Sequence, residues 1–206
     1  MNNDTPIQFT DTPKAVLHCI PVESLAGQPI FDVLPLYEDP RSLPVIGSTV
    51  WERRLNLDGL MSYKYGSPCN AYTQLYRSGI IEAVSGEIVA KPYKEWTVIP
   101  SHAFEGYLLQ FLPQCIRILQ QIGATAPVLF GLTLTKTRGI SMGATALEWG
   151  ISYPIAQNSV VLPEVLVEDL SMPVAKILRP IFDLIWNACG YPRSENFDSN
   201  DNWIPR

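Results

Sequence analysis

The chain has 206 residues and a formal net charge of −5, and apolar residues make up 47% of it. This apolar share can build a sizeable core and excludes an intrinsically disordered chain. The acidic balance argues against a surface that clamps phosphates directly, because nucleic-acid binders usually carry a basic footprint. We find neither a signal-peptide pattern nor the roughly 18 apolar residues of a membrane helix, and expect a soluble cytoplasmic protein with no membrane partner. The length fits a single domain over residues 1–206.

Cysteines and histidines give no metal signature, and no cofactor motif is found. His18 falls in an apolar stretch and is interpreted as a core histidine, whereas His102 is expected on the surface near a helix start. The sequence contains no phosphate-binding glycine loop and no G-x-S-x-G nucleophile elbow, so we predict no cofactor and no catalytic residue. Four cysteines lie too far apart for a metal clip and are expected to be buried free thiols: Cys19, Cys69, Cys115 and Cys189.

The first half of the chain predicts strands joined by an irregular segment. Residues 14–22 form an apolar run typical of a buried strand, and the proline-rich residues 23–48 allow at most short helical turns. Residues 53–66 alternate around Asp58-Gly59, which indicates two short strands or one bulged strand. Residues 71–84 predict a hairpin that turns at Ser78-Gly79, because glycine accepts a positive φ there.

The predicted hairpin carries a row of polar and aromatic side chains. Tyr72, Gln74 and Tyr76 share one strand face, and the opposite face carries Leu75 into the core. Such a row is more often half-buried by packing than displayed as a ligand platform, and packing is the interpretation that we prefer. Glu82 is expected to form an ion pair with Arg77 or Arg138 that fixes the strand register.

The second half begins with an amphipathic helix within residues 95–123. Ser101 is its expected N-cap, Pro113 predicts a kink and Gly123 a stop. In the last predicted helix, Pro180 introduces a kink or begins a second helix. The remaining predicted elements are strands at 126–137, 138–149 and 159–169, a helix at 172–190 and an irregular tail at 191–206.

This order of strands, helix, strands and helix predicts an α+β fold. We expect a mixed or antiparallel sheet with the 71–84 hairpin at its centre, covered by two long helices. The core should span residues 14–190, followed by the tail.

Three stretches carry a resemblance to a known family. They are "ERRLNLDGLMSY" (52–63), "AYTQLYRSGIIEAV" (71–84) with "IPSHAFEGYLLQFLPQCIRIL" (99–119) behind it, and residues 162–203, which end in "WNACGYPRSENFDSNDNW". In this order they resemble the C-terminal region of bacterial Schlafen/AlbA-type proteins, which are often labelled as DNA-binding, ATP-binding or helix-turn-helix proteins. The resemblance runs from about residue 14 to residue 203.

The resemblance implies an accessory role for this chain. Family members usually carry a Schlafen/AlbA-type domain N-terminal to this region, and that domain is the one linked to nucleic-acid binding and, in some relatives, to RNA cleavage. The present sequence lacks it, so we expect an isolated C-terminal domain or a stand-alone version. None of the family's nucleic-acid or nuclease residues transfers to a position in this chain.

Three functional hypotheses follow. The preferred one is a non-catalytic accessory domain that self-associates, binds a partner protein or senses a ligand for a partner, and nucleic acid is a possible partner through a partner domain. The second is direct RNA or DNA binding through aromatic stacking beside basic residues. The third is an enzyme whose acids converge only in the fold: Asp58, Glu82 and Glu105. The candidate binding residues are Tyr72, Gln74, Tyr76, Arg77, Glu82, Arg53 and Arg54.

Overall fold

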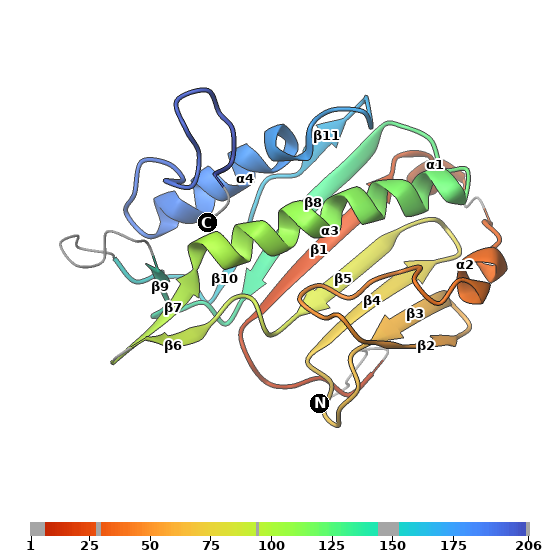
Figure 1. Cartoon of the computed structure of the whole chain (residues 1–206), viewed down its shortest axis with the longest axis horizontal. Helices are drawn as coiled ribbons and strands as arrows, with labels where there is room; N and C mark the ends of the chain where they lie inside the picture. The colour runs from red at the N-terminus through yellow and green to blue at the C-terminus, as the bar shows by residue number, and fades with distance from the viewer. Residues whose placement is uncertain (1–6, 28–29, 94, 144–152, 205–206) are drawn as a thin grey trace.

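The computed structural model describes residues 7–27, 30–93, 95–143 and 153–204, and these form an α+β fold around a mostly antiparallel sheet (Figure 1). The strands are β1 (Lys14–Pro21), β2 (Glu52–Leu55), β3 (Gly59–Tyr63), β4 (Ala71–Tyr76), β5 (Ile81–Ser85), β6 (Lys91–Tyr93), β7 (Trp96–Pro100), β8 (Val128–Thr135), β9 (Ser141–Gly143), β10 (Ser159–Val161) and β11 (Val165–Val167). The helices are α1 (Glu23–Gly27), α2 (Leu34–Glu38), α3 (Ser101–Gln121) and α4 (Val174–Ala188).

The main sheet has the strand order β10-β8-β1-β5-β4-β3-β2, and β11 also pairs with β8. All of its pairings are antiparallel. A small sheet, β6-β7-β9, contains one parallel pairing, between β7 and β9. Residues 144–149 of the expected strand at 138–149 lie outside the described residues.

The core lies between the main sheet and the helix α3, which crosses in front of it in Figure 1. In β1 and β8 every second residue is buried, because successive side chains of a strand point to opposite faces. Cys19 of β1 and Cys115 of α3 interact directly, so α3 packs on the face that holds the buried residues. One apolar cluster therefore joins sheet, α3 and α4, and all four free cysteines are buried, as predicted.

One predicted helix boundary was wrong. Ser101 is the first residue of α3 rather than its N-cap, a position that Pro100 occupies. The Ser101 hydroxyl donates instead to the Gly143 carbonyl of β9 at 2.9 Å, so it is used in a tertiary contact and not in a cap. For Pro180 the sequence left open a kink or a second helix, and Pro180 lies inside the single helix α4, so it does not begin a second helix. Among the described helices, none combines the length and hydropathy that a membrane-spanning segment requires.

The C-terminal tail is irregular but anchored on α3 and α4. Glu105 of α3 is 1% exposed and accepts hydrogen bonds from Trp186 Nε1 at 2.8 Å, Ser194 Oγ at 2.8 Å and Trp203 Nε1 at 3.0 Å. Burial raises the pKa of the Glu105 carboxyl, against the lowering effect of these donors. The buried Glu105 carboxyl therefore links α3 to α4 and to the C-terminal tail.

Candidate functional site

The face of the main sheet turned away from α3 is partly open to solvent. On β1, Lys14, Val16, His18 and Ile20 are half-buried, in alternation with fully buried neighbours. At the adjoining strands the exposure rises, to 72% for Val161 and 51% for Leu166. We call this surface the outer face and define it by Val16, His18, Ile20, Glu82, Leu129, Thr133, Val161 and Leu166.

A hydrogen-bonded cluster of His18, Glu82 and Tyr72 lies at the centre of the outer face. His18 and Glu82 are direct partners in the β1–β5 register, and His18 Nε2 lies 3.1 Å from Glu82 Oε2. Tyr72 donates its hydroxyl to Glu82 Oε1 at 2.7 Å. The His18 hydrogen bond lowers the pKa of the Glu82 carboxyl, and burial raises the pKa of Tyr72. Both carboxylate oxygens are thus engaged, and Tyr72 is held as a neutral donor.

This cluster corrects two expectations from the sequence. Glu82 pairs with His18 and Tyr72 rather than with Arg77 or Arg138. His18 is not enclosed in the core, because its side chain keeps 35% of its surface exposed. The alternation of β1 was the available signal: read as a two-faced strand rather than a buried one, it places His18 on the outer face.

The polar row of the hairpin is largely packed. Tyr72 is 4% exposed and meets the Phe9 ring edge-on, with the ring centroids 5.7 Å apart. Gln74 is 1% exposed and accepts a hydrogen bond from Asn56 Nδ2 at 2.8 Å. Tyr76 is half-buried, and burial raises the pKa of its hydroxyl. Tyr72 and Gln74 therefore support the neighbouring surface from within the fold and expose almost no surface of their own to a ligand.

The three candidate arginines do not form one basic surface. Arg53 donates to the Leu36 carbonyl at 3.2 Å and to the Asp39 carbonyl, which ties β2 to α2. Arg54 is the next residue on the same strand, so its side chain and that of Arg53 point to opposite faces of the sheet. The Arg54 guanidinium lies over the Tyr63 ring, 5.6 Å from the ring centroid. Arg77 donates to the Leu57 carbonyl at 3.2 Å across the adjoining turns.

A hollow of about 400 Å³ adjoins the cluster. Its wall includes Lys14, whose pKa is lowered by burial and by the nearby Lys136. Lys136 forms an ion pair with Asp11, whereas Lys14 donates to the Thr12 carbonyl at 3.2 Å. Its other lining residues are Phe9, Thr10, Asp11, Val16, Tyr72, Glu82, Val84 and Thr135.

The candidate acids do not assemble a catalytic group. Glu105 is bonded within the α3–tail contact, whereas Glu82 is bonded within the outer face. Asp58 lies in the β2–β3 turn, where its carbonyl accepts from the Arg77 amide. Across the described ranges, no group of three or more His, Cys, Asp or Glu residues is placed to hold a metal ion.

We compared the chain with models of protein families, with curated proteins and with solved structures, and no comparison gave a match.

Proposed function

We propose that this chain is a non-catalytic accessory domain that associates with a second copy of itself through the outer face. The observation that carries the proposal is the sheet face itself. It exposes aliphatic side chains, foremost Val161 and Leu166, on the sheet face that α3 does not cover. Exposed apolar patches on a folded domain commonly mark interaction sites.

The size of the outer face suits a dimer. The outer face spans four strand positions, since β10 and β11 pair with different ends of β8. At roughly 4.8 Å between strands and roughly 3.3 Å per residue over eight residues, this gives about 19 by 26 Å, on the order of 500 Å² in projection. An uneven protein surface buries more area than its projection. A standard interface buries about 800 Å² per partner. The outer face is thus of the right order for self-association.

Charge favours a second copy over a charged partner. Glu82 of the outer face is paired internally with His18. The face also carries Lys14 of β1 and the exposed Glu164, whose Cγ lies 3.6 Å from the position of a Cβ on Gly131. These two charges have opposite signs, so a second copy need not bring like charges together. A nucleic acid would instead need several unpaired cations on this face; Lys14 alone does not form such a basic surface, and the candidate arginines Arg53 and Arg77 are engaged with backbone carbonyls elsewhere.

The sequence resemblance supports an accessory role in a Schlafen/AlbA-type system. The stretches that carry it correspond to the region that follows the nucleic-acid-linked domain in that family, and no catalytic residue is implied for them. In that setting the domain would bring two copies of a larger assembly together.

The test is the absolute mass of the chain by light scattering behind a sizing column, over a hundredfold range of concentration. The expected result is a dimer of twice 23.0 kDa. The double variant Val161→Lys/Leu166→Lys should be monomeric, because both side chains are exposed and the new charges would face each other across the interface.

The matched control is Leu57→Lys, which adds a charge at a 91% exposed position in the β2–β3 turn and should leave the dimer intact. Circular dichroism checks that each variant is folded. A wild-type chain that stays at 23.0 kDa throughout would overturn self-association. A dimer that survives the double variant would exclude the outer face as its interface.

A further inference from the structure

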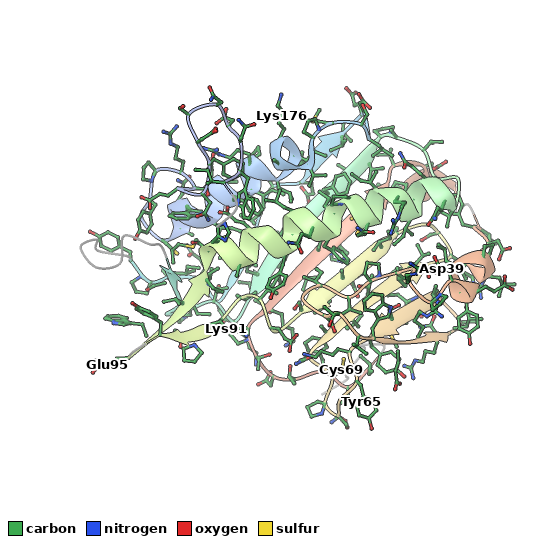
Figure 2. The ribbon with its side chains drawn as sticks, viewed as in Figure 1. Asp39, Tyr65, Cys69, Lys91, Glu95 and Lys176 are labelled. Atoms are coloured by element: carbon green, nitrogen blue, oxygen red, sulfur yellow. The ribbon has the colours of Figure 1, made fainter. Side chains whose placement is uncertain are left out.

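On the opposite side of the sheet, a groove of about 520 Å³ lies between α3 and the loop of residues 41–51. This volume falls in the range of small-molecule sites, about 300–1,000 Å³. Figure 2 labels Asp39, which directly follows α2 and lies two residues before the loop begins. The groove is lined by Arg41, Pro44, Val45, Ile46, Gly47, Ser48, Thr49 and Trp51 of the loop and by Tyr107, Gln110, Phe111 and Gln114 of α3.

The loop wall of the groove is fixed in place. Leu43, Val45 and Ile46 are between 0% and 2% exposed, so they anchor the loop in the core. Thr73 of β4 donates its hydroxyl to the Pro44 carbonyl at 2.7 Å, and Ser42 donates to the Leu36 carbonyl. Because these contacts already hold the loop in place, ligand binding requires little further ordering of the loop, which reduces the entropic cost of binding.

The groove combines aromatic walls with polar amides. Trp51 comes from the loop side, and Tyr107 and Phe111 come from α3. Tyr107 is 40% exposed, whereas Phe111 is 4% exposed and closes the floor. Flat aromatic walls favour a planar ring, since aromatic pairs gain from offset or edge-to-face contact beyond simple burial.

Arg41 gives the groove its charge. It is the one charged side chain among the described residues that line the groove, and no described residue forms an ion pair with its guanidinium. A guanidinium at the rim of an apolar groove attracts carboxylate, sulfonate or phosphate groups and can bind them in bidentate fashion.

From this geometry we propose that the groove is a binding site for a small planar aromatic anion. The ring lies between Trp51, Tyr107 and Phe111, and the acidic group meets Arg41. The site is independent of the outer face, because it is built from α3 and the 41–51 loop.

Two fluorescent probes that differ mainly in charge test the proposal. One is 8-anilino-1-naphthalenesulfonate, and the other is the neutral N-phenyl-1-naphthylamine. The anionic probe should bind at one saturable site and more tightly than the neutral probe. Arg41→Gln should weaken the anionic probe roughly fivefold to tenfold and leave the neutral probe almost unchanged. Tyr107→Ala should weaken both probes by about tenfold.

Matched controls separate this groove from other surfaces. Arg138→Gln removes an exposed charge elsewhere, and Tyr65→Ala removes a tyrosine that is 81% exposed at the lower edge in Figure 2. Both controls should bind like the wild type. The proposal is overturned if no saturable binding occurs, if Arg41→Gln affects the two probes equally, or if Leu166→Ser on the outer face abolishes binding while Tyr107→Ala does not.

Discussion

Replacing Glu105 tests whether the tail is held by a buried acid. In Glu105→Ala, the indole N–H of Trp186 and the hydroxyl of Ser194 lose their acceptor, and both residues are at most 2% exposed. Each buried group without a partner costs about 1–3 kcal/mol. Trp203 is half-buried and can turn toward water. Removal of the buried carboxylate offsets part of the loss, so we expect a decrease of about 2–5 kcal/mol in the free energy of unfolding.

The substitution Glu105→Gln keeps the shape of the side chain and one of its two acceptor oxygens. Its amide nitrogen would face the Trp203 N–H, which in the wild type donates to Glu105 Oε2 at 3.0 Å, so two donors would meet. We therefore expect a smaller decrease in the free energy of unfolding, about 1–2 kcal/mol, at low pH. The folded-state pKa of Glu105 is raised, so the wild-type carboxyl binds its proton more tightly in the folded than in the unfolded protein. Its contribution is fully present below the unfolded pKa near 4.5 and is lost as pH rises through the folded pKa.

Urea denaturation followed by tryptophan fluorescence measures both effects. The stability difference between wild type and Glu105→Gln should be largest below pH 4.5 and should shrink toward neutral pH. Ser194→Ala is the matched control, because it removes one donor at 2.8 Å and leaves the acid in place. A loss below about 1 kcal/mol in Glu105→Ala would refute the reasoning, since that is less than one buried donor costs.

Three further changes test the hairpin, the outer face and the tail. Glu82→Gln should reduce stability at neutral pH by about 1 kcal/mol, and the difference should disappear as pH falls through the lowered carboxyl pKa, as measured by urea denaturation. Gly79→Ala should cost more than Gly123→Ala in thermal denaturation: both have φ above +80°, but only at Gly79 would the new Cβ lie 2.7 Å from the Phe31 ring. Equal losses of thermal stability in Gly79→Ala and Gly123→Ala would mean that backbone strain alone, and not the contact with Phe31, determines the cost. Arg179→Gln should speed amide exchange in residues 194–203, and unchanged exchange would argue against its role in anchoring the tail.

Local patterns predicted most elements of the fold. The α+β class, the strand at 14–22 and the strand at 126–137 follow from periodicity and turn chemistry. The two-faced nature of β1 was missed because its outer side chains include Val16 and Ile20. An apolar residue on a half-open face gives the same sequence signal as one in the core.

The candidate sites depend on contacts that sequence spacing does not reveal. Glu82 and His18 are 64 positions apart and meet only through strand pairing. Glu105 and Trp203 are 98 positions apart, and they meet only because the tail folds back on α3. The groove requires the docking of residues 41–51 against α3, which no local pattern specifies.

The stretches that carry the family resemblance are occupied with holding the fold. Asn56 accepts from the Gly59 amide at 2.8 Å and donates to Gln74, so the β2–β3 turn is locked to the neighbouring hairpin. At the other end, Asn187 donates to the carbonyl of Tyr191 at 2.8 Å and thereby shapes the start of the tail.

These roles explain why the motif residues offer little exposed chemistry. A side chain whose donors and acceptors are used inside the fold has none left for a ligand. The two proposed sites instead use the exposed side chains of these stretches together with neighbouring segments, such as Tyr107 of 99–119 in the groove and Leu166 of 162–203 on the outer face. The outer face around Val161 and the groove around Arg41 lie on opposite sides of one sheet. A loss of self-association without loss of probe binding, and the reverse, would show that the two act independently.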